Sequence, residues 1–204
     1  MRIVRLAARR GADAVVLECM ALEPENQWVI ERRMVRSTIG VITNARPDHL
    51  DVMGPTASDV AETLALSVPY RGHLVTAERE LLSIFERAAG KAGAKLHMVD
   101  GSDVPDEVNA KFEYVSFKDN VACALRVCEL AGVAREVALA GMAVAAGDPG
   151  SMTVRRIVLG GADYVFANAF AANDRDSTLA AWALTADLTQ AGPQLPTAVI
   201  MNNR

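Results

Sequence analysis

Short apolar runs alternate with amphipathic stretches along most of this chain, and no other feature restricts its possible folds as strongly. Four of the runs have the length of buried strands, and they lie at residues 14–17, 38–43, 72–77 and 95–99. Residues with helical spacing fill the intervals, at residues 3–10, 26–35, 56–68, 81–90 and 121–132. Thr56, with Asp59 three residues later, forms a capping-box pattern at the start of the third of these helices. Because parallel strands are usually joined by helices, this alternation predicts an α/β fold with a mostly parallel sheet.

The rest of the chain predicts a second, shorter set of elements. A helix is expected at residues 134–146 and a turn at 148–150, and the strands that follow, at 154–159 and 164–169, flank Gly160 and Gly161. A helix at 178–188 and a strand at 197–201 complete the set. We interpret these elements as the beginning of a second α/β unit. So small a unit rarely buries enough apolar surface alone, so it should pack on the first domain or on something outside this chain.

Composition excludes several classes of protein. The chain has 204 residues, of which 51% are hydrophobic and 23% are charged, so it is neither disordered nor fibrous. A net charge of −4 gives no electrostatic reason to expect nucleic acid or anionic lipid as a partner. No uninterrupted apolar run reaches the ~18 residues of a membrane-spanning helix. The three cysteines form no CxxC pair, which favours a reducing compartment and a cytoplasmic location.

The sharpest local feature is an Asp-His-x-Asp cluster directly after the second predicted strand. Asp48, His49 and Asp51 should lie at the carboxyl edge of the sheet, where open α/β sheets bind their ligands. An imidazole beside carboxylates suits a divalent cation shared with phosphate oxygens, and Asp48 is placed to orient the ring of His49. The alternative is a loop whose turn-forming residues hydrogen-bond only to one another.

A second candidate ligand is Glu18, which ends the first predicted strand. If that strand neighbours the strand before His49, the two side chains form a two-ligand site for a hard metal ion. The alternative is that Glu18 is a solvated strand end or a helix-cap partner. His73 and His97 fall at or within strands, and we interpret both as structural.

Two asparagine-containing segments also stand at element ends. Asn120 lies at the start of a predicted helix, where an N-cap is the ordinary role for asparagine. Asn168, Asn173 and Asp174 lie between the end of a strand and the start of a helix, and Asp174 alone could cap that helix.

An ordered set of motifs closely resembles one family, the ligase subunits of poly-γ-glutamate synthases, in the Mur ligase superfamily. The motifs are LECMALEPE, VITNARPDHLDVMGPT, GHLVTAE, FKDNVACAL, GDPGSM, FANAFAANDRDSTLAAW and IMNNR. The resemblance covers essentially the whole chain, although DHLD alone also occurs in other Mur-type ligases. It implies a partial Mur-ligase central domain, which binds ATP, at residues 1–159 and the beginning of a Rossmann-like C-terminal ligase domain at 160–204.

The resemblance also implies a reaction and a set of site residues. The family uses ATP and Mg²⁺ to convert a carboxylate into an acyl phosphate, which an amine then attacks to form an amide bond. The substrates it implies are glutamate and the growing poly-γ-glutamate chain. The family's motifs place metal binding at Glu18 and His49, a catalytic role at His49 and Asp48, nucleotide binding at Asn120 with Arg155 and Arg156 nearby, and substrate contacts at Asn168, Asn173 and Asp174.

Departures from the family pattern matter as much as the matches. No GxxGKS/T phosphate loop occurs in the sequence, and most of the family's C-terminal domain would follow Arg204. Cys123 stands where other members have a second asparagine. We therefore expect the isolated chain to be inactive, and the alternative is a non-catalytic, partner-binding fragment that a phosphate-loop segment complements. The family implies other subunits of a membrane-associated synthase as partners, with attachment to the membrane only through them.

Overall fold

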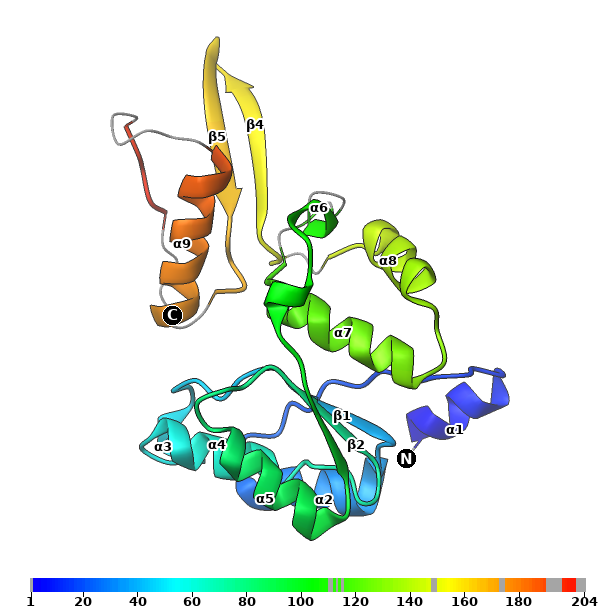
Figure 1. The fold of residues 1–204 in the computed structure, drawn as a ribbon. Coiled ribbons are helices and arrows are strands. Elements are labelled where there is room, and N and C mark those ends of the chain that lie inside the picture. The colour runs from blue at the N-terminus through cyan, green and yellow to red at the C-terminus, as the bar shows by residue number, and fades with distance from the viewer. Residues whose placement is uncertain are drawn as a thin grey trace. The chain divides into compact units, whose positions relative to one another are not determined.

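The computed structural model describes residues 2–109, 112, 114, 116–147, 150–172, 175–189 and 196–200. The chain forms two compact units (Figure 1). The first comprises residues Met1–Pro105 and Phe117–Ala138, and the second comprises Asp106–Ser116 and Leu139–Arg204. The functional domain boundary expected after residue 159 stays a prediction.

A three-stranded parallel sheet forms the centre of the first unit. Its strands are β1 (Ile39–Ile42), β2 (His73–Thr76) and β3 (Lys95–Met98), in the order β1-β2-β3. These strands lie within three of the four apolar runs identified in the sequence, so the expected α/β class with parallel strands is confirmed.

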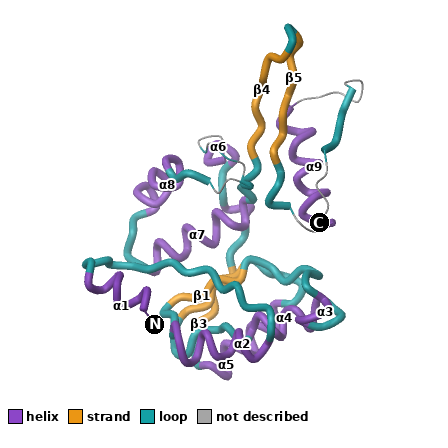
Figure 2. Tube along the Cα trace, turned by 180° about the vertical axis from the view of Figure 1, so that it is seen from behind, coloured by secondary structure: helices purple, strands orange, loops and turns teal. Residues whose placement is uncertain are grey.

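Helices precede, connect and follow these strands (Figure 2). In chain order the first unit has α1 (Arg2–Arg9), α2 (Pro24–Val29), the π-helical turn η1 (Ile30–Val35), α3 (Leu50–Met53), α4 (Ala57–Ala65), α5 (Leu82–Ala92), the 3₁₀ turn η2 (Gly101–Asp103) and α7 (Lys118–Leu130). The start of α4 follows the sequence closely. Thr56 accepts a hydrogen bond from the backbone of Asp59, whose carboxylate accepts one from the backbone of Thr56, so the predicted capping box is confirmed.

Both faces of the sheet are covered by helices. On one face, Leu74 of β2 and Phe85 of α5 are fully buried in the main apolar cluster, together with Ala61 of α4. On the other face, α7 packs Cys123 against Val75 and Ala77. Burial raises the pKa of the Cys123 thiol to about 11, so this sulfur is a packing group rather than a nucleophile.

The second unit contains a long antiparallel hairpin. Its strands are β4 (Thr153–Leu159) and β5 (Ala162–Asn168), joined at Gly160 and Gly161, whose φ angles of 60° and 81° a residue with a Cβ rarely adopts. The described helices α6 (Asp106–Asn109) and α9 (Arg175–Thr189) also lie in this unit, and α8 (Arg135–Val144) crosses the division between the units.

Two predicted strands are wrong. Residues 14–17 and 197–200 form no regular structure, and residue 201 of the second predicted strand lies outside the described part of the chain. Val16 is 94% exposed and Ile200 is 82% exposed, so these apolar runs are not covered as buried strands would be. A strand is stable only when a neighbour satisfies its backbone groups, and the described residues offer neither segment such a neighbour.

Candidate functional site

The carboxyl edge of the parallel sheet brings three loops together. Residues 43–49 follow β1, residues 77–81 follow β2 and residues 99–101 follow β3. Because the strands are parallel, all three loops leave the sheet at the same edge, which is the usual ligand-binding edge of such sheets. The predicted position of His49 at this edge is therefore consistent with the structure.

The first two loops are joined by one carboxylate. The backbone N–H of Ala45, a residue only 5% exposed, donates to Oε2 of Glu78 at 2.9 Å. The other oxygen of Glu78 accepts from the N–H groups of Glu80 and Leu81, at 2.9 and 3.1 Å. Glu78 thus fixes the loop that leads to His49 while ordering its own loop.

His49 itself is exposed and is the N-cap residue of α3. Its φ of 48° is left-handed, and its backbone N–H donates to Oδ1 of Asp48 at 2.9 Å. The same Oδ1 lies 3.7 Å from Nε2 of the ring, which is ion-pair range but too long for a hydrogen bond. Asp48 therefore fixes the backbone of this turn and lies beside the imidazole.

The predicted partner of His49 does not lie at a strand end. Glu18 is exposed within the irregular segment that was expected to be the first strand, so that part of the prediction is wrong. Among the described residues, no hydrogen bond or ion pair joins Glu18 to His49, and no group of three or more His, Cys, Asp or Glu side chains could hold a metal ion. The described residues therefore do not by themselves bring together a full set of Mg²⁺ ligands around His49.

A second polar cluster ties the loops after β2 and β3 to the start of α7. Nη2 of Arg79 lies 2.9 Å from Oδ1 of Asp100 and 3.3 Å from Oδ1 of Asp119. The N–H of Gly101 donates to the same Asp119 oxygen at 2.8 Å. Hydrogen bonds from Ser102, and then from Arg79, hold the pKa of Asp100 at about 2, and the two carboxylates raise the pKa of Arg79.

Asn120 is the third residue of α7, whose N-cap is Phe117, so the N-cap interpretation of Asn120 is wrong. Its backbone N–H donates to the carbonyl oxygen of Phe117 at 3.0 Å, and the residue is exposed. Asn120 directly follows Asp119 in the chain. It therefore stands at the helix end that the cluster around Arg79 contacts.

The remaining predicted site residues belong to the second unit. Arg155 and Arg156 are exposed on β4, and Asn168 ends β5 with its Oδ1 accepting from the N–H of Phe170 at 3.1 Å. Asn173 and Asp174 lie outside the described residues.

Glu78, Arg79 and Asp119 are residues that the sequence analysis did not single out. Glu78 lies inside the motif GHLVTAE and Asp119 inside FKDNVACAL, whereas Arg79 directly follows the first of these motifs. Glu78 and Arg79 also stand just beyond a strand end, which was the signal available. Their partners are 33 and 40 residues away in the chain, so only the fold identifies the contacts.

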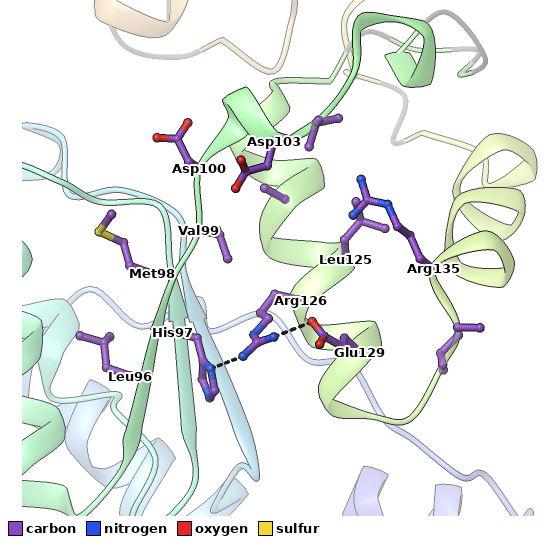
Figure 3. Close-up of a pocket in the computed structure, with 14 residues that line it drawn as sticks. Leu96, His97, Met98, Val99, Asp100, Asp103, Leu125, Arg126, Glu129 and Arg135 are labelled. Atoms are coloured by element: carbon purple, nitrogen blue, oxygen red, sulfur yellow. Dashed lines mark hydrogen bonds and ion pairs between the residues drawn. The ribbon is translucent and has the colours of Figure 1, made fainter.

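The two strand histidines contact each other, in keeping with their structural interpretation. Nδ1 of His73 lies 2.8 Å from Nε2 of His97, whose Nδ1 lies 2.8 Å from Nη2 of Arg126. His97 and Arg126 line a cavity of about 850 Å³. Figure 3 shows these two side chains, with Glu129 paired to Arg126.

The fold and the joined loops define an α/β protein with its candidate site at the carboxyl edge of a parallel sheet. Residues 154–204 match the family model of the poly-gamma-glutamate synthase CapB C-terminal domain. The chain is 41% identical over 203 residues to the capsule biosynthesis protein CapB of Bacillus anthracis, covering 100% of this chain and 43% of that protein. It is 40% identical over 180 residues to the PGA synthase CapB of Bacillus subtilis (strain 168), and the alignment covers 88% of this chain and 46% of that protein. The chain is thus similar to CapB proteins along essentially its whole length.

The chain spans less than half the length of these curated relatives, at 43% and 46%. No solved structure matches it. Among the described residues, no helix is both long enough and apolar enough to cross a membrane.

Proposed function

We propose that this chain is part of an ATP-dependent carboxylate–amine ligase that extends poly-γ-glutamate. The observation that carries the proposal is its identity of 40–41% to two CapB proteins, one described as a PGA synthase. The carboxyl edge of the sheet, where Glu78 orders the loop before His49, supports a nucleotide site there.

The proposed reaction has two steps. A carboxylate oxygen of the growing chain attacks the γ-phosphorus of ATP, which forms an acyl phosphate and releases ADP. The amine of an incoming glutamate then attacks the acyl carbon, loses a proton and displaces phosphate. The first step brings the negative charges of the carboxylate and the polyphosphate together, so positioning and electrostatic stabilisation must supply most of its catalysis.

In this proposal, ATP and Mg²⁺ are the cofactors, and the substrates are glutamate and the poly-γ-glutamate chain. Glu18 and His49 are proposed cation ligands, although they do not make a site by themselves. The other proposed site residues are Asp48, Asn120, Arg155, Arg156, Asn168, Asn173 and Asp174. Other synthase subunits are the proposed partners, and any association with a membrane would be through them.

The first test is glutamate incorporation into polymer, with ADP release followed in parallel. The chain would be assayed alone and after co-expression with the part of the Bacillus subtilis relative outside the alignment. We expect incorporation only in the combined sample. His49→Ala and Glu18→Ala should each lower it at least ~100-fold, since misplaced phosphate-binding groups have effects of that size. Glu136→Ala, on exposed surface, is the matched control. Undiminished incorporation in both variants contradicts the cation-ligand assignment, and a combined sample that makes no polymer contradicts the ligase proposal.

A second candidate function is that of a non-catalytic subunit that binds a phosphate-loop segment of another polypeptide. The exposed run containing Val15, Val16 and Leu17 favours it, because its sequence is that of a buried strand but no described strand pairs with it. Binding of the added segment without ADP release would support this function over the ligase.

A further inference from the structure

We propose that Glu78 and Arg79 are positioning residues that together hold the two halves of the candidate nucleotide site. Glu78 fixes the loop leading to His49, and Arg79 fixes the start of α7, which carries Asn120. We call this pair the Glu78–Arg79 brace. The inference rests on the proposed function for the site's role, but the geometry of the brace is independent of it.

The contact of Glu78 with the first loop is a buried one. Ala45 is 5% exposed, so its N–H cannot be well hydrated, and Oε2 of Glu78 is the acceptor it uses at 2.9 Å. The other carboxylate oxygen is held by two backbone N–H groups of the loop after β2. The carboxylate is therefore fixed on one side while it orders the His49 loop on the other.

Arg79 makes its contacts with the other half of the candidate site, which consists of the loop after β3 and the start of α7. Its guanidinium lies within 3.3 Å of Asp100 and Asp119, and Asp119 also accepts from Gly101. The Arg79 side chain is 45% exposed, so each ion pair alone is weak. Their combined effect is to connect the loops after β2 and β3 with the first turn of α7.

Because the two residues are adjacent, they fix both parts of the site relative to the same strand end. A displacement of about 1 Å of a positioned group can lower the efficiency of a site ~100-fold. We therefore expect the Glu78–Arg79 brace to affect nucleotide affinity as well as stability. A network of surface ion pairs away from the site would affect stability alone.

Hydrogen–deuterium exchange on the full chain tests the two contacts separately. We expect Glu78→Ala to speed exchange of the Ala45 amide at least ~10-fold, as expected when a buried amide loses its hydrogen bond, and to leave residues 117–121 unchanged. Arg79→Ala should speed exchange at Gly101 and leave residues 43–49 unchanged. Glu80→Ala is the matched control, since only the backbone N–H of Glu80 contacts Glu78. Amides of β2 serve as the reference for global unfolding.

Glu78→Gln covers the case in which the alanine variant unfolds. It keeps the volume of the side chain but replaces a carboxylate oxygen with an NH₂ group, so exchange should again rise at Ala45 and not in β2. The brace is overturned if neither Glu78 variant alters the Ala45 amide, or if all regions accelerate by the same factor.

Calorimetric titration with Mg·ATP tests the positioning role. Glu78→Gln and Arg79→Ala should each weaken nucleotide binding at least ~10-fold relative to wild type and to Glu80→Ala. Unchanged affinity, with the local exchange effects present, overturns the positioning role. A wild-type chain that binds no nucleotide but shows both local exchange effects contradicts the proposed nucleotide site of this chain and leaves the brace itself supported.

Discussion

At the scale of single residues, the hydrogen bonds around His97 fix its protonation state. A guanidinium only donates, so Nδ1 of His97 must accept from Arg126, and Nε2–H then donates to Nδ1 of His73. A proton on Nδ1 would face the N–H groups of Arg126. Burial, followed by the charges of Arg126, His73 and Lys95, lowers the pKa of His97 below its usual 6.5.

This pKa shift predicts a loss of stability in mild acid. Above about pH 6.5, His97 is neutral in both the folded and the unfolded chain, so its contribution to stability is fully present. As the pH falls below this value, the unfolded chain takes up a proton that the folded chain resists, so the free energy of unfolding decreases. Urea denaturation at pH 7.5, 6.5 and 5.5 measures the effect.

The control variants separate this residue from other acid effects. His97→Gln should flatten the dependence between pH 6.5 and 5.5, whereas His49→Gln, at an exposed histidine, should keep it. An identical slope in wild type and His97→Gln would contradict the assignment.

At the scale of elements, the contact of η2 with α7 depends on a missing side chain. A Cβ on Gly101 would lie 2.7 Å from Oδ1 of Asp119 and 2.8 Å from its backbone nitrogen. These distances are shorter than real Cβ contacts, so the turn and the helix can approach this closely only with glycine.

Gly101→Ala should therefore destabilise the chain by about 1–3 kcal/mol, the usual range for overpacking. Gly90→Ala is a matched control within α5, because a Cβ there meets nothing within 4 Å. Alanine at that position should stabilise the chain by about 0.5–1 kcal/mol through helix propensity. Chemical denaturation of both variants measures the difference, and equal effects would show that Gly101 is not closely packed.

At the scale of the whole molecule, the two units differ in how well their strands are covered. Leu74 and Val75 of β2 are fully buried, whereas Val158 and Leu159 of the hairpin are 72% and 68% exposed. A two-stranded sheet with so little cover is marginally stable.

We therefore expect amides of β4 and β5 to exchange at least ~100-fold faster than those of β2. Hydrogen–deuterium exchange on the full chain at neutral pH measures this difference. Comparable protection in the two units would show that the hairpin is stabilised as strongly as the central sheet.

Sequence patterns predicted most elements of the first unit because their causes are local. Apolar periodicity located β1 to β3 and the helices between them, and Thr56 with Asp59 located the start of α4. The strand predicted at residues 14–17 does not form, and the reason is physical. Apolar content makes a segment able to form a strand, but pairing requires a neighbour that no local pattern supplies.

The candidate site was predictable only in part. The position of His49 after a strand placed it at the carboxyl edge, but its pairing with Glu18 depended on the failed strand. The contacts of Glu78 and Arg79 could not be predicted, because their partners lie 33 and 40 residues away.

The amino-acid sequence by itself determined the α/β class, the strands of the parallel sheet and the resemblance to CapB proteins, since apolar periodicity and ordered motifs are properties of the chain before it folds. Only the tertiary structure decided which loops are joined by Glu78 and Arg79, which tautomer His97 adopts, and which apolar runs stay uncovered. These properties depend on distances between residues far apart in the chain, and folding alone sets those distances.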